Sequence, residues 1–378
     1  MERKRYFHTN SVHFNGNEHT KNKSKAKPIY QTSAFVFESL VDMESYFSGE
    51  KEYLYSRYGN PNTEDLGKGV ALLEEADDGI ATSSGMSAIL CAVLSVCRSG
   101  DHILAALDVY GGTYSLFEQE LKNLGIEVTF VEPHTDWQKA VKENTRALFC
   151  ESVTNPHIRV ESIEDLMKFA KENQLRVIVD NTFATPYFAK PIILGADLVI
   201  HSATKYLGGH SDVTAGVIVG CEPLISRVKQ LVITMGTTLS PFEAWLTCRG
   251  LKTLGLRMER QSSNAATLAD YLKKQPKVEH VYYPESLSSF GNGAIVTIRL
   301  KQEVDIHAFF SSFSFVKIAP TLAGVETSIS YPVGTSHRSV PIEKREALGI
   351  SSQDVRISVG IEDHRDIIND FLEALKKA

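Results

Sequence analysis

Residues 176–188 read R-V-I-V-D-N-T-F-A-T-P-Y-F, and residues 198–216 read L-V-I-H-S-A-T-K-Y-L-G-G-H-S-D-V-T-A-G. Each segment contains a short apolar run, V-I-V in the first and L-V-I in the second, with the length and β-branched content of a buried parallel strand. The first run ends in Asp180, and the second leads to Lys205. Because ligands of open α/β sheets bind at the carboxyl ends of the strands, we expect these two side chains to meet at one site.

The polar residues after these two strands suit one cofactor in particular. Asp180 supplies a carboxylate, Lys205 an amine, and Ser202 and Thr204 supply hydroxyl groups beside the lysine. Pyridoxal phosphate requires a lysine amine for its Schiff base, an acid for its ring nitrogen and hydrogen-bond donors for its phosphate. The pattern therefore predicts a pyridoxal-phosphate site, although Asp180 on its own would also fit a solvated strand end.

The run H-S-A-T-K-Y-L-G-G-H-S-D, with V-D-N-T-F upstream, resembles the Cys/Met-metabolism family of pyridoxal-phosphate enzymes. That family contains cystathionine γ-synthase, cystathionine β- and γ-lyases, methionine γ-lyase and O-acetylhomoserine sulfhydrylase. The resemblance extends from about Pro28 to the C-terminus. It implies a fold-type-I α/β architecture, with a mostly parallel central sheet flanked by helices and a small C-terminal α+β domain. It also implies that Lys205, Asp180 and Tyr110 are the catalytic residues.

Changes in sequence pattern, together with this resemblance, divide the chain into three parts. Residues 1–62 carry many polar residues and no long helical period, so we expect an extended arm that contributes to a neighbouring subunit's site. Residues 63–255 alternate helical and strand patterns and form the expected cofactor domain, and residues 256–378 form the C-terminal domain. The family further implies homodimers that pair into a homotetramer.

Composition argues against several other classes of protein. The chain has 378 residues, of which 43% are hydrophobic and 23% charged, as in ordinary globular proteins. A net charge of −6 and a pI near 6.1 argue against a nucleic-acid partner. No apolar run approaches the roughly 18 residues of a membrane helix, and the basic start has no signal-peptide core after it. Five cysteines without a C-x-x-C pair predict free, buried thiols in a reduced, cytoplasmic protein.

Two residues at the end of the arm are implied to act across a subunit boundary. The arm ends in Y-L-Y-S-R-Y-G-N-P-N, which taken alone is a surface loop. Beside the family's Y-S-R-x-x-N-P pattern, Tyr55 and Arg57 are implied to bind the cofactor phosphate of a neighbouring subunit. Arginine suits this task because its planar fork binds phosphate oxygens in pairs.

Three further segments carry expected cofactor contacts. The tripeptide S-G-M lies between a short strand and an apolar helix, where backbone N–H groups favour a phosphate, although a lone Ser-Gly is more often a simple helix cap. The family places the phosphate on the amides of Gly85 and Met86, beside Ser84. Tyr110, otherwise an ordinary loop aromatic, is implied to stack on the pyridine ring. Asn155 is implied to donate to the ring hydroxyl.

The C-terminal part carries the expected substrate contacts. The run I-A-P-T-L-A-G-V-E-T-S resembles the family motif whose serine orients the catalytic lysine, with Thr321 in place of that serine. Arg356 matches the family's arginine for the substrate α-carboxylate, although a strand arginine also fits a surface salt bridge.

Three departures from the family pattern bear on the substrate. Leu54 and Pro320 stand where cystathionine-specific members tend to carry acidic residues for the distal ammonium of a long diamino acid. Each missing carboxylate would remove a charge-assisted contact worth about 1.5–3 kcal/mol. An apolar pocket would suit methionine, homocysteine or an O-acylhomoserine. Methionine γ-lyases, however, usually place cysteine where this chain has Gly112, so the exact substrate stays open.

We therefore expect a pyridoxal-phosphate enzyme of sulfur amino-acid metabolism that eliminates or replaces a γ-substituent. β-Elimination from cystathionine or cysteine is the alternative within the family, and a catalytically silent binding homologue is the alternative outside it. An aminotransferase on the same fold is disfavoured by the arm and C-terminal motifs. His201 and His210 flank the site without metal-ligand spacing, so no metal is expected.

Overall fold

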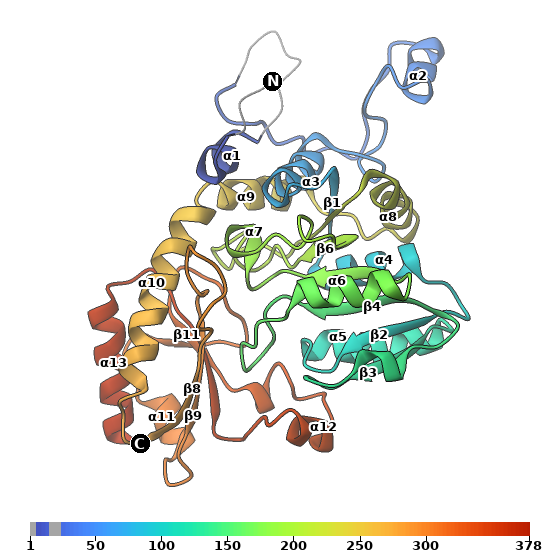
Figure 1. Ribbon diagram of the computed structural model, residues 1–378. Helices are drawn as coiled ribbons and strands as arrows, with labels where there is room; N and C mark the ends of the chain where they lie inside the picture. Colours follow the sequence, from blue (N-terminus) through green and yellow to red (C-terminus); the bar gives the residue numbers. More distant parts are fainter. Residues whose placement is uncertain (1–4, 15–23) are drawn as a thin grey trace.

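The computed structural model describes residues 5–14 and 24–378. Its larger sheet has the strand order β1-β7-β6-β5-β4-β2-β3 (Figure 1). The strands from β6 to β3 in this order run parallel, and β7 runs antiparallel to both of its neighbours. The predicted mostly parallel central sheet is therefore confirmed. Its strands span Asp78–Thr82 (β1), His102–Ala106 (β2), Glu127–Val131 (β3), Thr145–Glu151 (β4), Arg176–Asp180 (β5), Leu198–His201 (β6) and Gly216–Gly220 (β7).

Helices link these strands and pack against the sheet. α4 contacts β5, β6 and β7, and α6 contacts β5. A π-helix follows α5 at Leu116–Leu121, and a 3-10 helix spans Trp137–Ala140. The α-helices of this part span Pro61–Glu74 (α3), Gly85–Val96 (α4), Gly111–Ser115 (α5), Ile163–Glu172 (α6), Thr185–Phe188 (α7), Glu222–Met235 (α8) and Pro241–Leu251 (α9).

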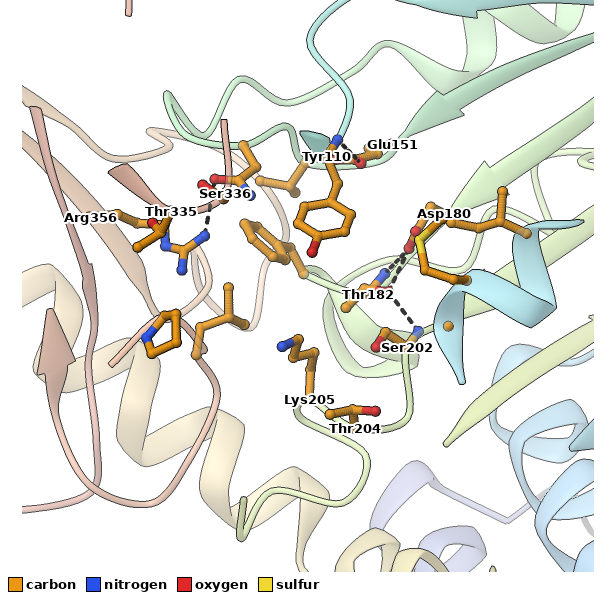
Figure 2. Close-up of a pocket in the computed structure, with 18 of the residues that line it drawn as sticks. Tyr110, Glu151, Asp180, Thr182, Ser202, Thr204, Lys205, Thr335, Ser336 and Arg356 are labelled. Atoms are coloured by element: carbon orange, nitrogen blue, oxygen red, sulfur yellow. Dashed lines mark hydrogen bonds between the residues drawn. The ribbon is translucent and has the colours of Figure 1, made fainter. Parts of the chain in front are cut away.

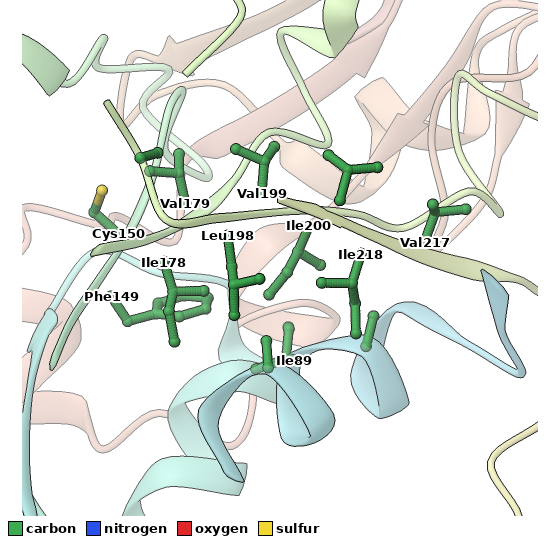
Figure 3. Packing of buried hydrophobic residues seen from close by; sticks show 14 of the residues in the cluster. Ile89, Phe149, Cys150, Ile178, Val179, Leu198, Val199, Ile200, Val217 and Ile218 are labelled. Atoms are coloured by element: carbon green, nitrogen blue, oxygen red, sulfur yellow. The ribbon is translucent and has the colours of Figure 1, made fainter. Parts of the chain in front are cut away.

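Side chains of the central strands alternate between the two faces of the sheet. Ile178, Leu198 and Ile218 point toward α4, where Ile89 faces them, whereas Val199 points to the opposite face (Figure 3). All five residues are at most 2% exposed. Because both faces are buried, the strand sequences are continuous apolar runs. The packed sheet thus holds the residues at its strand ends in fixed positions.

A second sheet lies in the C-terminal part, with the strand order β10-β11-β12-β9-β8. Its pairs are antiparallel except for β10 with β11. α10 and α13 pack against each other and bury apolar side chains with this sheet (Figure 1). The predicted C-terminal α+β architecture is confirmed. Its elements span Leu254–Leu272 (α10), Val278–Tyr282 (β8), Ile295–Leu300 (β9), Ile306–Ser311 (α11), Lys317–Ile318 (β10), Ser328–Ser330 (β11), Ile342–Ala347 (α12), Asp354–Ser358 (β12) and His364–Lys377 (α13), with a 3-10 helix at Pro332–Gly334.

The arm contains two helices that the sequence pattern did not predict, α1 at Phe7–His13 and α2 at Leu40–Phe47. α1 packs on α3 and α10, which are distant in the sequence. Helices this short take most of their stability from such tertiary contacts, so local periodicity does not reveal them. Residues 1–4 and 15–23 of the predicted arm lie outside the described residues.

The structure also bears on predictions made from composition. All five cysteines are free, and four of them are buried, which confirms the predicted buried thiols for those four. Within the described residues, no helix combines the length and apolarity that a bilayer crossing requires. In the same part of the chain, no group of three or more His, Cys, Asp or Glu side chains is arranged to hold a metal ion.

Candidate active site

A cavity of about 490 Å³ opens at the carboxyl ends of β4, β5 and β6 (Figure 2). The N-terminus of α4, strand β12 and two C-terminal loops complete its wall. The cavity brings together most of the residues predicted to bind the cofactor or the substrate: Ser84, Gly85, Met86, Tyr110, Asn155, Asp180, Ser202, Thr204, Lys205 and Arg356.

Lys205 lies just beyond β6, and its side chain points into the cavity (Figure 2). Its Nζ donates to Thr321 Oγ1 at 2.9 Å, so the threonine hydroxyl contacts the lysine as the sequence predicted. Burial and, secondarily, the positive charge of Arg356 lower the Lys205 pKa to about 8. A fraction of this amine is therefore neutral near neutral pH, as a nucleophile or a base requires.

Asp180 ends β5 and is held by Thr182, which the sequence analysis did not single out. Thr182 donates from its backbone N and its Oγ1 to Asp180 Oδ1, at 3.0 and 2.5 Å. The same Oγ1 accepts from Ser202 N at 2.8 Å. Burial raises the pKa of Asp180, while the Thr182 hydrogen bonds and the charge of His201 oppose that rise. One hydroxyl thus joins the carboxylate to the residue that follows β6.

The N-terminus of α4 forms the wall of the cavity beside Ser202. Ser84 caps this helix, and its side chain and backbone N–H are both engaged with Ser87. The amides of Gly85 and Met86 belong to the first helical turn, where N–H groups have no intrahelical acceptor. A Cβ on Gly85 would lie 2.8 Å from Ser202 Cβ, so glycine is required for this close approach of α4 to the residue after β6.

Thr204 lines the cavity, but its hydroxyl is engaged with the backbone. Its Oγ1 donates to Ala215 O at 3.2 Å and accepts from Ala215 N at 3.0 Å. Both bonds attach the turn that carries Lys205 to the residue before β7. Thr204 therefore fixes the position of the lysine in this structure.

Arg356 projects from β12 into the cavity and is buried. Its Nη1 donates to Asn155 Oδ1 at 3.2 Å and its Nη2 to Thr321 O at 3.4 Å. Its Nε is buried without a hydrogen-bond partner among the described residues. Burial lowers the Arg356 pKa to about 10, so the guanidinium stays charged at neutral pH. A buried cation with an unpaired donor suits an anionic ligand group.

Tyr110 points its ring into the cavity opposite Asp180 (Figure 2). Its backbone N donates to Glu151 Oε1 at 2.6 Å. A Cβ on Gly112 would lie 2.4 Å from Tyr110 Cε1, so a side chain at this position would displace the ring. Glycine at position 112 is therefore part of what sets the position of Tyr110.

The comparisons with known proteins agree with this geometry. The family model for Cys/Met metabolism PLP-dependent enzymes matches residues 8–376. This chain belongs to that family. It is 40% identical over 371 residues to an L-methionine gamma-lyase of Fusobacterium nucleatum subsp. nucleatum, and 41% identical over 365 residues to a cystathionine beta-lyase of Lactococcus lactis subsp. cremoris, with 93% of each chain covered. The crystal structure of cystathionine gamma-lyase from Lactobacillus plantarum, complexed with L-serine, matches with a TM-score of 0.93 and 34% identity over 99% of each chain.

The chain is therefore a pyridoxal-phosphate enzyme of sulfur amino-acid metabolism with the fold-type-I architecture that the sequence predicted. The cavity fits this cofactor in three respects. Lys205 presents an amine with a lowered pKa, Gly85 leaves room at a helix N-terminus, and Asp180 provides a carboxylate on the same sheet edge.

Two predicted cofactor residues, Tyr55 and Arg57, are not part of this cavity. Arg57 Nη1 donates to Ile233 O at 3.0 Å, near the end of α8, and its guanidinium lies 4.7 Å from the Tyr58 ring centre. Tyr55 is 41% exposed. Within one copy of the chain, these two residues therefore lie outside the cavity, and the site that they were predicted to serve belongs to a neighbouring subunit.

The cavity also contains residues that the sequence analysis did not identify. Glu151 ends β4 just as Asp180 ends β5, so the strand-end rule could have found it. The others could be placed at the site only by the fold, because they lie on α4, on a 3-10 helix or on loops and turns: Ile89, Val153, Thr182, Phe183, Leu322, Gly334, Thr335 and Ser336.

Thr182 provides a test of the hydrogen bonds that link Asp180 to Ser202. We expect Thr182→Val to raise the cofactor dissociation constant about tenfold, because Asp180 loses a donor and Ser202 N loses its acceptor. Thr182→Ser keeps the hydroxyl and should bind within about threefold of wild type. Absorbance titration of the apoprotein measures both constants. Tight binding by Thr182→Val would show that this hydroxyl is dispensable.

Proposed function

We propose that this enzyme cleaves the bond between Cγ and sulfur in an amino acid with a short, uncharged side chain, such as methionine or homocysteine. The observation that carries the proposal is Pro320, which lines the cavity beside Thr321. The charged residues of the cavity wall are Glu151, Asp180, Lys205 and Arg356. We assign Asp180, Lys205 and Arg356 to the cofactor or the α-carboxylate, and Glu151 accepts from Tyr110 N. Position 320 therefore offers no carboxylate to the end of the substrate.

The relatives support two candidate reactions. The 40% identity to an L-methionine gamma-lyase supports γ-elimination. The 41% identity to a cystathionine beta-lyase makes β-elimination the second candidate. Of the two, γ-elimination fits Pro320 and Leu54 better, because a diamino acid would lose the charge-assisted contacts that acidic residues provide.

Arg356 and Asn155 are proposed to orient the substrate and the cofactor. The guanidinium of Arg356 would bind the α-carboxylate, for which its unpaired Nε provides a donor. Asn155 Oδ1 accepts from Arg356, which leaves its Nδ2 to donate to the ring hydroxyl. Tyr110 would stack on the ring, and the Gly85 and Met86 amides, with Ser84 and Ser202 beside them, would hold the phosphate. Thr204 would join them by turning its hydroxyl hydrogen, which here is donated to Ala215 O, toward the phosphate.

Lys205 is proposed to move the protons. When bound, pyridoxal phosphate supplies an electron-accepting ring that stabilises negative charge at the substrate Cα. Asp180 would hold a proton at the ring nitrogen, which maintains that capacity. Lys205 Nζ, neutral above a pKa of about 8, would take the proton from Cα and deliver protons within the site. Thr321 Oγ1 restrains this amine at 2.9 Å.

We propose that the site is completed by a second copy of the chain, within a homodimer that pairs into a tetramer. Tyr55 and Arg57 would then reach the cofactor phosphate of the partner. The arm supports this assembly, because α2 stands apart from the body in Figure 1 and apolar side chains on and just before this helix are exposed. Val36, Leu40 and Val41 are 95%, 77% and 82% exposed, as expected of a surface that is covered in an assembly.

We also propose a division of the chain into three parts and a location in the cell. We divide the chain into the arm at 1–62, the cofactor domain at 63–255 and the C-terminal domain at 256–378. We also place the protein in the cytoplasm, where reducing conditions keep cysteines free; the five free thiols support this.

A substrate panel on the holoenzyme tests the proposed reaction. We expect methionine, with water, to give 2-oxobutanoate, ammonia and methanethiol, and homocysteine to give 2-oxobutanoate, ammonia and hydrogen sulfide, in both cases without any acceptor. Turnover of an O-acylhomoserine that requires cysteine or sulfide would instead identify γ-replacement. Pyruvate as the only keto product from cystathionine would identify β-elimination and overturn the proposal.

A carboxylate introduced at position 320 should shift the substrate preference toward cystathionine. We expect Pro320→Glu to raise turnover of cystathionine relative to methionine about tenfold, because it adds a carboxylate for the distal ammonium. Pro276→Glu, at an exposed proline, is the matched control. An unchanged ratio in Pro320→Glu would place the distal end of the substrate elsewhere.

The pKa of Lys205 predicts how apoprotein takes up the cofactor with pH. Only the neutral amine attacks a carbonyl, and the Lys205 pKa is lowered to about 8. The attachment rate should therefore rise about tenfold per pH unit below this pKa and level off above it. Stopped-flow absorbance measures the rate. A rate that keeps rising toward about pH 10 would indicate an ordinary lysine.

A further inference from the structure

Glu151 is a second carboxyl group at the cavity, and the proposed reaction does not use it. It ends β4 beside Asp180, its register partner at the end of β5. Glu151 is 6% exposed and lines the cavity wall. Adjacent parallel strands lie about 4.8 Å apart, and two carboxyl groups in such surroundings cannot both ionise without a large cost. Ionisation of both carboxyl groups at this sheet edge is therefore disfavoured.

The hydrogen-bond donors around the two groups are distributed unequally. Asp180 Oδ1 accepts from both the backbone N and the hydroxyl of Thr182. Glu151 Oε1 accepts from Tyr110 N at 2.6 Å. Hydrogen bonds donated to a carboxylate favour its ionised form, so the group with more donors holds the charge. This comparison places the negative charge on Asp180 and the proton on Glu151.

The charge of the nearby Arg159 does not move the proton from Glu151 to Asp180. Arg159 Nε and Nη2 donate to Asp108 at 2.9 and 3.0 Å, and Nη2 also donates to Glu161 at 2.8 Å. Its charge is therefore shared between two carboxylates other than Glu151. Burial and the charge of Asp180 raise the Glu151 pKa well above its usual range, with Asp108 adding to the rise and Tyr110 N and Arg159 opposing it.

We propose that Glu151 is a protonated positioning residue that holds the backbone of Tyr110 and leaves the negative charge of this sheet edge on Asp180. Tyr110 immediately precedes α5, and its ring points into the cavity while its N–H faces Glu151 (Figure 2). A neutral carboxyl group accepts this N–H without competing with Asp180 for the proton of the ring nitrogen. The proposal rests on the cofactor contacts proposed above.

Infrared difference spectroscopy of the holoenzyme tests the protonation state directly. The wild-type spectrum minus that of Glu151→Gln should show the C=O band of a protonated carboxyl group. Glu164→Gln, at an exposed glutamate of α6, is the control and should remove an ionised carboxylate band. An ionised carboxylate band lost in Glu151→Gln would overturn the proposal.

Cofactor affinity tests the positioning role. Glu151→Gln keeps an acceptor for Tyr110 N and should weaken cofactor binding by at most about threefold. Glu151→Leu removes the acceptor and should weaken binding about tenfold or more, with thermal unfolding as the check on its fold. Equal losses in the two variants would overturn the proposal, and if Glu151→Leu does not fold, the infrared result decides. Neither measurement uses substrate, so failure here leaves the proposed γ-elimination standing.

Discussion

Replacing Lys205 with alanine is expected to remove the visible absorbance of the lysine-bound cofactor and to lower turnover by about 10⁴-fold or more. The loss is large because one amine both binds the cofactor covalently and moves the protons. Two contacts hold this amine in place, because Nζ lies 2.9 Å from Thr321 Oγ1 and Thr204 attaches the same turn to Ala215. Absorbance and steady-state kinetics of the purified variant measure the two effects.

A further variant tests whether position 205 needs an amine that can become neutral or only a positive charge. Lys205→Arg keeps a cation but cannot become neutral at working pH, so it should lose as much turnover as Lys205→Ala. Lys274→Ala removes an exposed lysine and serves as the control. If Lys205→Ala kept both absorbance and turnover, another lysine would have to bind the cofactor. A wild-type protein that lacks this absorbance and is unchanged by Lys205→Ala would instead support the catalytically silent alternative.

The central sheet could be predicted because its strands are buried on both faces. The V-I-V and L-V-I runs became β5 and β6, with Val199 and Leu198 pointing to opposite faces and both fully buried. By contrast, α1 depends on distant partners. His8 Nε2 lies 3.0 Å from Glu259 Oε1, a contact across 251 residues of chain that no local pattern encodes.

The site residues that could be predicted are those at strand ends and those in family motifs. Asp180 and Lys205 follow buried strands, and the structure brings them to one cavity. Thr182 could not be assigned from spacing, since its role depends on Ser202 N lying 2.8 Å from its hydroxyl. The effect of Gly112 is likewise three-dimensional, because it appears only when the ring of Tyr110 is placed.

For Tyr55 and Arg57, the contact that the family motif implies differs from the contacts seen in a single chain. The family pattern assigns them to a phosphate, whereas one copy of the chain directs Arg57 to the carbonyl of Ile233. Both observations are satisfied if the phosphate belongs to a partner subunit. The exposed apolar arm near α2 would then be covered by that partner, and the active site would exist only in the assembly.

Arg57→Ala is expected to weaken cofactor binding by about 10–100-fold, because it removes a charge-assisted phosphate contact. Arg98→Ala, at an exposed arginine outside the arm, is the control. The loss alone does not show which subunit Arg57 serves. The decisive experiment combines Arg57→Ala in one chain with Lys205→Ala in another, because Lys205→Ala is defective in a different part of the site.

Co-expression of the two defective variants under separate tags should restore activity. If Arg57 serves its partner, each mixed dimer contains one site with both residues intact and one site lacking both. Random pairing makes half of the dimers mixed. At a cofactor concentration that leaves Arg57→Ala homodimers unloaded, about a quarter of all sites should therefore be active. If Arg57 served its own subunit, every site in every dimer would lack one residue, and mixing would restore nothing. Recovery near a quarter would therefore establish that the site is shared between subunits, independently of which substrate it cleaves.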